Sequence, residues 1–229
     1  RDEMVKVKPD VYLVGEVWSD AKTVAPYLKG LPALFNFDLG YAITGVVNAE
    51  QDTVELINSY KRIIDVYNSS TSSYIDATFL KNHDQNRILS ELGDNEEKLR
   101  MAVSILMTLP GTPYIYYGEE IGMKGMKPDE YIREPFIWDH GKNDPAQTSW
   151  EEPRYSTDQT VVPLADQLKD NKSLFNFYKE WVESRNESDV LTYGSVEASP
   201  IKIKEIVSYF RVKGDDKAFV IHNISGVDI

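Results

Sequence analysis

The stretch VYLVGEVW, residues 11–18, is short, rich in β-branched and aromatic residues, and almost wholly apolar. This pattern is typical of a strand that is buried on both faces, as in a parallel sheet. The ten residues before it, RDEMVKVKPD, indicate the end of a helix that Pro9 closes. A chain that starts within a helix is expected to lack an upstream part of its domain.

Strands and helices alternate downstream of this stretch. We predict strands over 33–40, 73–84 and 112–123, and helices over 52–67, 96–109 and 173–185. The helices follow from apolar residues at spacings of three and four, from a stop at Pro110-Gly111, and from Ser173 as an N-cap. The alternation predicts an α/β fold of parallel strands joined by crossover helices. Four such units fit either half of an eight-unit barrel or a small open sheet.

The last part of the chain has a different pattern. Residues 124–170 are a long polar excursion with several prolines, whereas residues 195–229 alternate and contain a Gly-Asp-Asp turn at 214–216. The alternation predicts antiparallel strands. We therefore predict a first domain over residues 1–190 and the start of an all-β domain over residues 191–229.

Composition excludes several classes of function. The net charge of −12 would repel a phosphate backbone, so nucleic acid is not expected as a partner. No apolar run approaches the ~18 residues that cross a bilayer, so no membrane span is expected. The absence of cysteine excludes disulfides, thiolate catalysis and Cys-ligated zinc.

Two carboxylates occupy equivalent places in the predicted strands. Glu16 lies near the end of the first strand and Asp84 at the end of FLKNHD. In an α/β barrel, side chains at the carboxyl ends of the strands reach the active-site mouth. Glycoside hydrolysis needs a carboxylic acid to protonate the leaving oxygen and carboxylates to face the positive charge on the sugar. Taken singly, each of the two is better explained as a helix N-cap or loop carboxylate.

The motifs around these carboxylates decide between the alternatives. VGEVW, FLKNHDQNR and GTPYIYYGEEIGM, in this order, resemble the fifth, seventh and eighth strand motifs of glycoside hydrolase family 13, the α-amylase family. The resemblance implies strands five to eight of a (β/α)8 TIM barrel, followed by the beginning of an antiparallel β-sandwich domain. It also implies that Glu16 is the general acid/base, that Asp84 stabilises the transition state, and that His83 binds a sugar hydroxyl. A structural role for His83 is the alternative.

The resemblance extends to four further residues. Trp18 is a candidate sugar-stacking platform, although a core tryptophan of the barrel wall fits nearly as well. Asp129 and Arg133 resemble a pair after strand eight that binds sugar hydroxyls, and an exposed i,i+4 ion pair is the equal alternative. Arg87 is expected to brace the site rather than to touch sugar.

The family's nucleophile is missing from this sequence. It is an aspartate within a Gly-x-Arg-x-Asp motif on the fourth strand, and no such motif occurs here. We therefore expect the nucleophile upstream, the N-terminal half of the catalytic domain as the partner, and no activity from this segment alone. Many relatives bind calcium, so calcium is expected, with ligands outside this chain. For the pair Glu119-Glu120 we favour a structural role over a metal site.

The predicted function is retaining hydrolysis of α-1,4-glucosidic bonds in starch and maltooligosaccharides, as in α-amylases and neopullulanase-like enzymes. Two alternatives stay open: a 4-α-glucanotransferase of the same family, and a non-catalytic glucan-binding relative. The resemblance also favours a secreted, periplasmic or cell-surface location in a bacterium.

Overall fold

The structure is a computed structural model that describes residues 1–142 and 144–229. The strands are β1 (Val14–Gly15), β2 (Ala33–Phe35), β3 (Ile75–Phe79), β4 (Thr112–Tyr114), β5 (Ser195–Ala198), β6 (Ile206–Lys213) and β7 (Asp216–Asn223). The α-helices are α1 (Asp2–Val7), α2 (Ala21–Val24), α3 (Phe37–Ala49), α4 (Leu56–Ser70), α5 (Ile88–Glu91), α6 (Glu96–Thr108), α7 (Asp129–Ile132), α8 (Leu164–Gln167), α9 (Leu174–Glu187) and α10 (Asp189–Tyr193). The 3₁₀ helices are η1 (Ala25–Lys29), η2 (Glu119–Ile121) and η3 (His140–Lys142).

Strands β1 to β4 form one parallel sheet in the order β1-β2-β3-β4. Val14 pairs with Ala33, and Ala77 pairs with both Phe35 and Thr112. Each connection therefore leads to the next strand in space, and the carboxyl ends of all four strands meet at one edge of the sheet. The predicted parallel arrangement is confirmed.

The strands are shorter than predicted. The strand expected over 33–40 ends at Phe35, because the Asn36 side chain accepts a hydrogen bond from the Leu39 N–H at 3.0 Å and starts α3. The strands expected over 73–84 and 112–123 end at Phe79 and Tyr114, where the chain turns into the loops of the sheet edge. The expectation of a first strand buried on both faces is also wrong for the described residues. Val14 is partly exposed, since β1 pairs only with β2 there.

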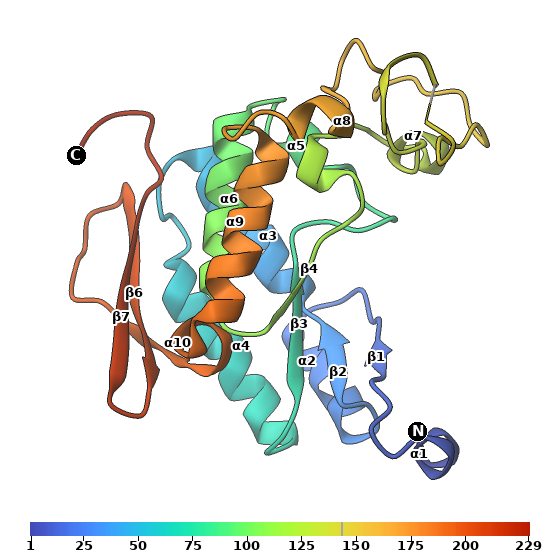
Figure 1. The fold of residues 1–229 in the computed structure, drawn as a ribbon. Coiled ribbons are helices and arrows are strands. Elements are labelled where there is room, and N and C mark those ends of the chain that lie inside the picture. The colour runs from blue at the N-terminus through green and yellow to red at the C-terminus, as the bar shows by residue number, and fades with distance from the viewer. Residues whose placement is uncertain (143) are drawn as a thin grey trace.

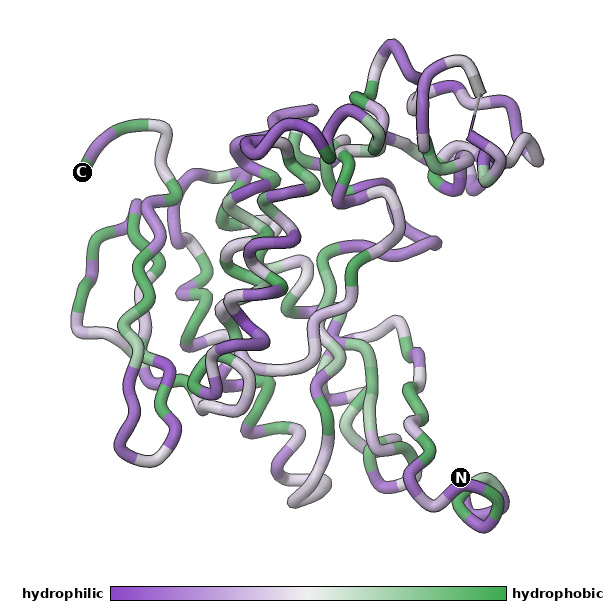
Figure 2. Tube along the Cα trace, viewed as in Figure 1, coloured by the Kyte–Doolittle hydropathy of each residue, from purple (hydrophilic) through white to green (hydrophobic). Residues whose placement is uncertain are grey.

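Helices α3, α4, α6 and α9 lie between the parallel sheet and the antiparallel sheet of β5, β6 and β7 (Figure 1). The helices predicted over 52–67, 96–109 and 173–185 correspond to α4, α6 and α9, and the Ser173 side chain caps α9 as expected. Apolar residues run along these helices and both sheets, as the green segments of Figure 2 show. One hydrophobic cluster contains residues of all four helices and of β5, β6 and β7.

The antiparallel sheet was predicted correctly. Its order is β5-β6-β7, and Lys213 pairs with Asp216 across a two-residue loop. Gly214 in that loop has a φ of 60°, a backbone conformation that favours glycine. On the inner face, the Tyr209 hydroxyl and the Thr108 hydroxyl of α6 are 2.7 Å apart and buried. The sheet is therefore attached to the helices by polar as well as apolar contacts.

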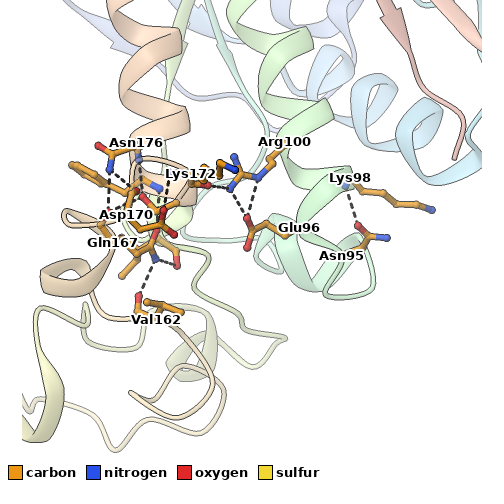
Figure 3. Close-up of polar contacts among 12 residues, drawn as sticks. Asn95, Glu96, Lys98, Arg100, Val162, Gln167, Asp170, Lys172 and Asn176 are labelled. Atoms are coloured by element: carbon orange, nitrogen blue, oxygen red, sulfur yellow. Dashed lines mark hydrogen bonds and ion pairs between the residues drawn. The ribbon is translucent and has the colours of Figure 1, made fainter. Parts of the chain in front are cut away.

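The long segment between β4 and α9 is fixed to the helices at several points. Gln167 is buried, and its side-chain amide donates to the carbonyls of Ile121 and Val162, both at 2.9 Å. Nearby, Arg100 of α6 bonds Glu96 and donates to the Lys172 carbonyl at 2.8 Å (Figure 3). These contacts hold residues 162–172 against η2 and α6.

A buried carboxyl in β3 makes the stability of this sheet depend on pH. Asp76 accepts hydrogen bonds from Asn36 and from the Tyr60 hydroxyl, both at 3.1 Å, and burial raises its pKa from 3.8 to about 6. The folded state therefore holds this proton more tightly than the unfolded chain does. The contribution of Asp76 to the free energy of unfolding is fully present below pH 4 and is lost as the pH rises through 6.

We expect Asp76→Asn to remove this dependence. Between pH 5 and pH 7.5 the wild-type protein should lose about 1 kcal/mol of unfolding free energy that the variant keeps. Chemical denaturation of the complete protein at both pH values measures the difference. Asp65→Asn, which replaces an exposed carboxylate on α4, is the matched control and should behave like wild type. Equal pH slopes for wild type and Asp76→Asn would contradict the assignment.

Candidate active site

Glu16 follows β1 directly, at the carboxyl edge of the parallel sheet. The residue before it is Gly15. A larger residue would clash there, because a Cβ would lie 2.4 Å from a Leu31 methyl group and 2.6 Å from a Leu34 methyl group. Successive side chains of a strand point to opposite faces, so Glu16 points away from these leucines. It is exposed, and its Oε1 accepts a hydrogen bond from Asn82 Nδ2 at 3.2 Å.

Asp84 lies at the same edge, in the turn that follows β3. Its Oδ1 is 2.6 Å from Arg133 Nη2 and 3.5 Å from His83 Nε2. The side chain is 35% exposed, so it is neither buried in the interior nor fully solvated. The main-chain N–H of Asp84 donates to Asn82 Oδ1 at 3.0 Å. Glu16 and Asp84 were predicted to share one site. The side chain of Asn82 connects them through hydrogen bonds to both residues.

Arg133 connects two of the other predicted residues, His83 and Asp129, to Asp84. Its Nε donates to the His83 carbonyl at 2.8 Å, and its Nη2 also bonds Asp129 at 2.8 Å. The i,i+4 ion pair of Asp129 and Arg133 therefore exists, and the same guanidinium also reaches the Asp84 carboxylate. Lys127 is a second cation beside Asp129 and is the main reason why the pKa of Asp129 is lowered. His83 is half exposed and open to a ligand.

Trp18 is an exposed side chain within this segment. It is 53% exposed, and one face of its indole stacks on Phe37 with 5.5 Å between ring centroids and 11° between planes. Its Nε1 donates to the Tyr41 hydroxyl at 2.9 Å, and Gln85 Nε2 donates to the same hydroxyl at 2.9 Å. The indole orientation is therefore fixed by contacts with α3 before any ligand binds.

A groove of about 400 Å³ lies between α3 and the loop after β3. Trp18, Tyr41, Asp84, Gln85 and Lys127 are among the residues that line it. It joins the tryptophan to one of the two predicted catalytic carboxylates. An aromatic platform with hydroxyl, amide and charged groups beside it is suited to a neutral polyhydroxylated ligand.

Arg87 follows Asn86, which lines the groove, and is itself 2% exposed. It donates to the Tyr117 carbonyl at 2.7 Å, and its guanidinium carbon lies 4.7 Å and 4.8 Å from the ring centroids of Tyr116 and Tyr117. Arg87 therefore contacts the loop after β4 and has no exposed surface for sugar. Glu119 is buried near it, where it accepts a hydrogen bond from the Tyr178 hydroxyl at 3.0 Å. Burial raises the pKa of Glu119 to about 8.

Sequence reasoning did not single out Asn82, Tyr41 or Gln85. Asn82 is part of the quoted NHD motif, and its place directly before two predicted site residues was the available signal. Tyr41 was missed because α3 was not predicted over these residues. Gly40 lets α3 approach closely, since a Cβ there would lie 2.6 Å from the Phe79 carbonyl oxygen. That approach brings Tyr41 next to Gln85.

No metal site was found in the part of the chain that the structure describes. There, no group of three or more His, Cys, Asp or Glu side chains is arranged to hold an ion. Binding of calcium through residues elsewhere stays a prediction. None of the described helices is long and apolar enough to cross a membrane.

Comparison with known proteins identifies the family. Residues 1–194 match the family model described as "Alpha amylase, catalytic domain". Alpha-amylase 3 of Dictyoglomus thermophilum is 41% identical over 222 residues, which are 97% of this chain and 44% of that protein. The 4-alpha-glucanotransferase of Thermotoga neapolitana is 32% identical over 217 residues, 93% of this chain and 48% of that protein.

Structure comparison agrees with the family match. The crystal structure of the alpha-amylase from H. orenii matches with a TM-score of 0.90 and 42% identity, over 98% of this chain and 45% of that chain. The chain thus spans a little under half the length of these relatives. Its parallel sheet forms part of a (β/α)8 barrel, and its antiparallel sheet is part of the β domain that follows. The chain belongs to the α-amylase family of glycoside hydrolases.

Proposed function

We propose that the complete protein is a retaining glycoside hydrolase that cleaves α-1,4-glucosidic bonds in starch and maltooligosaccharides. The observation that supports this most directly is the connection of Glu16 to Asp84 through Asn82 at the carboxyl edge of the parallel sheet. Family membership supports the same reaction class.

The proposed reaction has two steps. Glu16 donates its proton to the glycosidic oxygen while a nucleophilic aspartate, supplied by a part of the barrel outside this segment, attacks the sugar carbon. The glycosyl–enzyme bond forms as the bond to the leaving sugar breaks. Glu16, now a carboxylate, takes a proton from water, and the water releases the sugar with retained configuration. Asp84 faces the positive charge that develops on the ring, and Arg133 keeps this carboxylate in place.

Product analysis on maltoheptaose tests this function. The complete protein should release shorter maltooligosaccharides whose first-formed anomer, observed by NMR, is α. Residues 1–229 expressed alone should release none, because they lack the nucleophile. Inverted products, or robust cleavage by the segment alone, would contradict the proposal.

Transfer to a sugar acceptor is the second candidate function. A relative that is 32% identical is named a 4-alpha-glucanotransferase, and the exposed indole face of Trp18 could hold an acceptor sugar as well as a leaving one. The same product analysis distinguishes the two: chains longer than maltoheptaose indicate transfer. If the complete protein binds maltoheptaose without any turnover, it is a glucan-binding relative.

Trp18→Ala should weaken the binding of long glucans. The indole presents one open apolar face, because Phe37 covers the other, and removing a stacking contact worth about 1 kcal/mol raises KM roughly fivefold. Trp18→Phe keeps an apolar face and loses the N–H to Tyr41, so its KM should rise less. Initial rates on maltoheptaose and maltotriose measure the effect. Wild-type KM values for Trp18→Ala on both substrates would exclude a sugar contact.

A further inference from the structure

The Asn82 side chain contacts both Glu16 and Asp84, the two residues that carry the proposed catalytic carboxylates. It lies three residues after β3, in the loop at the carboxyl edge of the sheet. Its Nδ2 donates to Glu16 Oε1 at 3.2 Å, and its Oδ1 accepts from the Asp84 N–H at 3.0 Å. The two partners are 68 residues apart in the sequence but belong to the same sheet edge.

The orientation of the amide follows from this pair of contacts. The Asp84 N–H can only donate, so it requires the oxygen of the amide on its side. The main chain supports the same turn, because the Gln85 N–H donates to the Asn82 carbonyl at 3.2 Å. The two hydrogens of Nδ2 must then lie on the opposite side, where Glu16 is. Asparagine is the residue type that can accept from the turn and donate to a carboxylate with one short side chain.

We infer that Asn82 is a positioning residue that orients Glu16 for proton donation while it holds the turn that carries Asp84. The inference rests on the proposed function. With Oε1 occupied by the amide hydrogen, Oε2 is the oxygen that carries the proton of the acid form. Without the amide, the carboxyl group can rotate, and either oxygen can carry the proton. The bond thus selects the oxygen from which the proton leaves.

The charged groups around Glu16 allow this contact to be tested by its effect on pH dependence. The ionisable side chains close to Glu16 or Asn82 in the sequence are Tyr12, Asp20, Lys81, His83 and Asp84; in addition, Tyr41 bonds Trp18 and Arg133 bonds Asp84. Substitutions at position 82 change none of them. A shift of the pH–rate profile in such a variant therefore reports on the contact between position 82 and Glu16.

Asn82→Asp separates the two contacts of the amide. An aspartate oxygen can still accept from the Asp84 N–H, so the turn is kept. The other oxygen takes the place of the Asn82 Nδ2–H donor and carries negative charge about 3 Å from Glu16. This charge favours the protonated form of Glu16. In the complete protein, the alkaline limb of the kcat/KM profile on maltoheptaose should move up by about one pH unit. We expect kcat at the optimum to fall about tenfold with little change in KM.

Asn82→Ala is the comparison variant, because it loses both contacts. Its kcat should fall at least as far as that of Asn82→Asp, while its alkaline limb moves up by less, since a donor is lost and no charge is added. Thermal unfolding of both variants checks that they are folded. If Asn82 only supported the turn, Asn82→Asp, which keeps an acceptor for the Asp84 N–H, would keep the wild-type kcat at its pH optimum, and this result would overturn the inference. A wild-type protein that cleaves no glucan would instead refute the proposed function.

Discussion

Glu16→Gln in the complete protein should lower kcat/KM for starch about 10³-fold, one of the two largest effects we expect from a substitution in this segment. Glutamine has nearly the same shape as glutamate, and it can still accept the hydrogen bond from Asn82 through its carbonyl oxygen. What it cannot do is donate a proton to the glycosidic oxygen. The loss should therefore appear in kcat, while the affinity for maltoheptaose changes little.

The dependence on the leaving group makes this prediction specific. A maltosyl substrate with a dinitrophenyl leaving group needs no protonation to depart, so Glu16→Gln should form the covalent glycosyl–enzyme at a nearly normal rate. Hydrolysis of that intermediate still needs the base, so a burst of dinitrophenol followed by a slow phase is expected. Glu3→Gln removes an exposed glutamate of α1 and should match wild type. Equal losses on both substrates would mean that Glu16 is not the acid.

Asp84→Asn should lower kcat about 10³-fold with a small change in KM. The carboxylate faces charge that develops only as the ring flattens, so removing it affects the transition state more than the bound sugar. The ion pair with Arg133 should be lost with the charge. Steady-state kinetics on maltoheptaose, with thermal unfolding as a check of the fold, measure the effect.

Asp129→Asn is the matched control for Asp84→Asn. The two carboxylates bond the same Arg133 nitrogen, at 2.6 Å and 2.8 Å. If Asp84 acted only as an ion-pair partner, both variants would lose similar amounts of activity. We expect Asp129→Asn to raise KM a few-fold and to leave kcat near wild type, as a residue that contacts a hydroxyl would. Similar kcat values for the two variants would exclude a special role for Asp84.

Local sequence patterns predicted the regular elements better than their ends. Helices α4, α6 and α9 follow from apolar spacing because each covers a core with one face. The strands were predicted too long, since VYLVGEVW and TPYIYYGEEIGM remain apolar after they leave the sheet. In these loops, Trp18, Tyr116 and Tyr117 pack around the site rather than within the sheet. Helix α3 was missed because its first residues, Phe37 to Leu39, have the composition of a strand, and only Asn36 marks its start.

The candidate site shows what motifs can predict and what they cannot. Glu16, His83 and Asp84 were selected by their motifs, and the structure places Glu16 and Asp84 on either side of Asn82. The connection of Arg133 to both Asp129 and Asp84 could not be predicted, because it depends on how the segment between β4 and α9 folds back. Helical spacing predicts the contact with Asp129 but does not indicate a partner 49 residues away.

The attachment of the antiparallel sheet to α6 limits which segments of this protein can be exchanged with those of a homologue. Besides the contact between Thr108 and Tyr209, the buried Arg211 guanidinium donates to the Thr108 and Gly194 carbonyls. The last turn of α6 and the strands of this sheet thus complete each other's hydrogen bonding. A chimera that exchanges residues 195–223 with those of a homologue must also exchange the facing side of α6. A chimera joined at residue 191, with α6 left unchanged, would pair the α6 surface of one protein with the sheet surface of another.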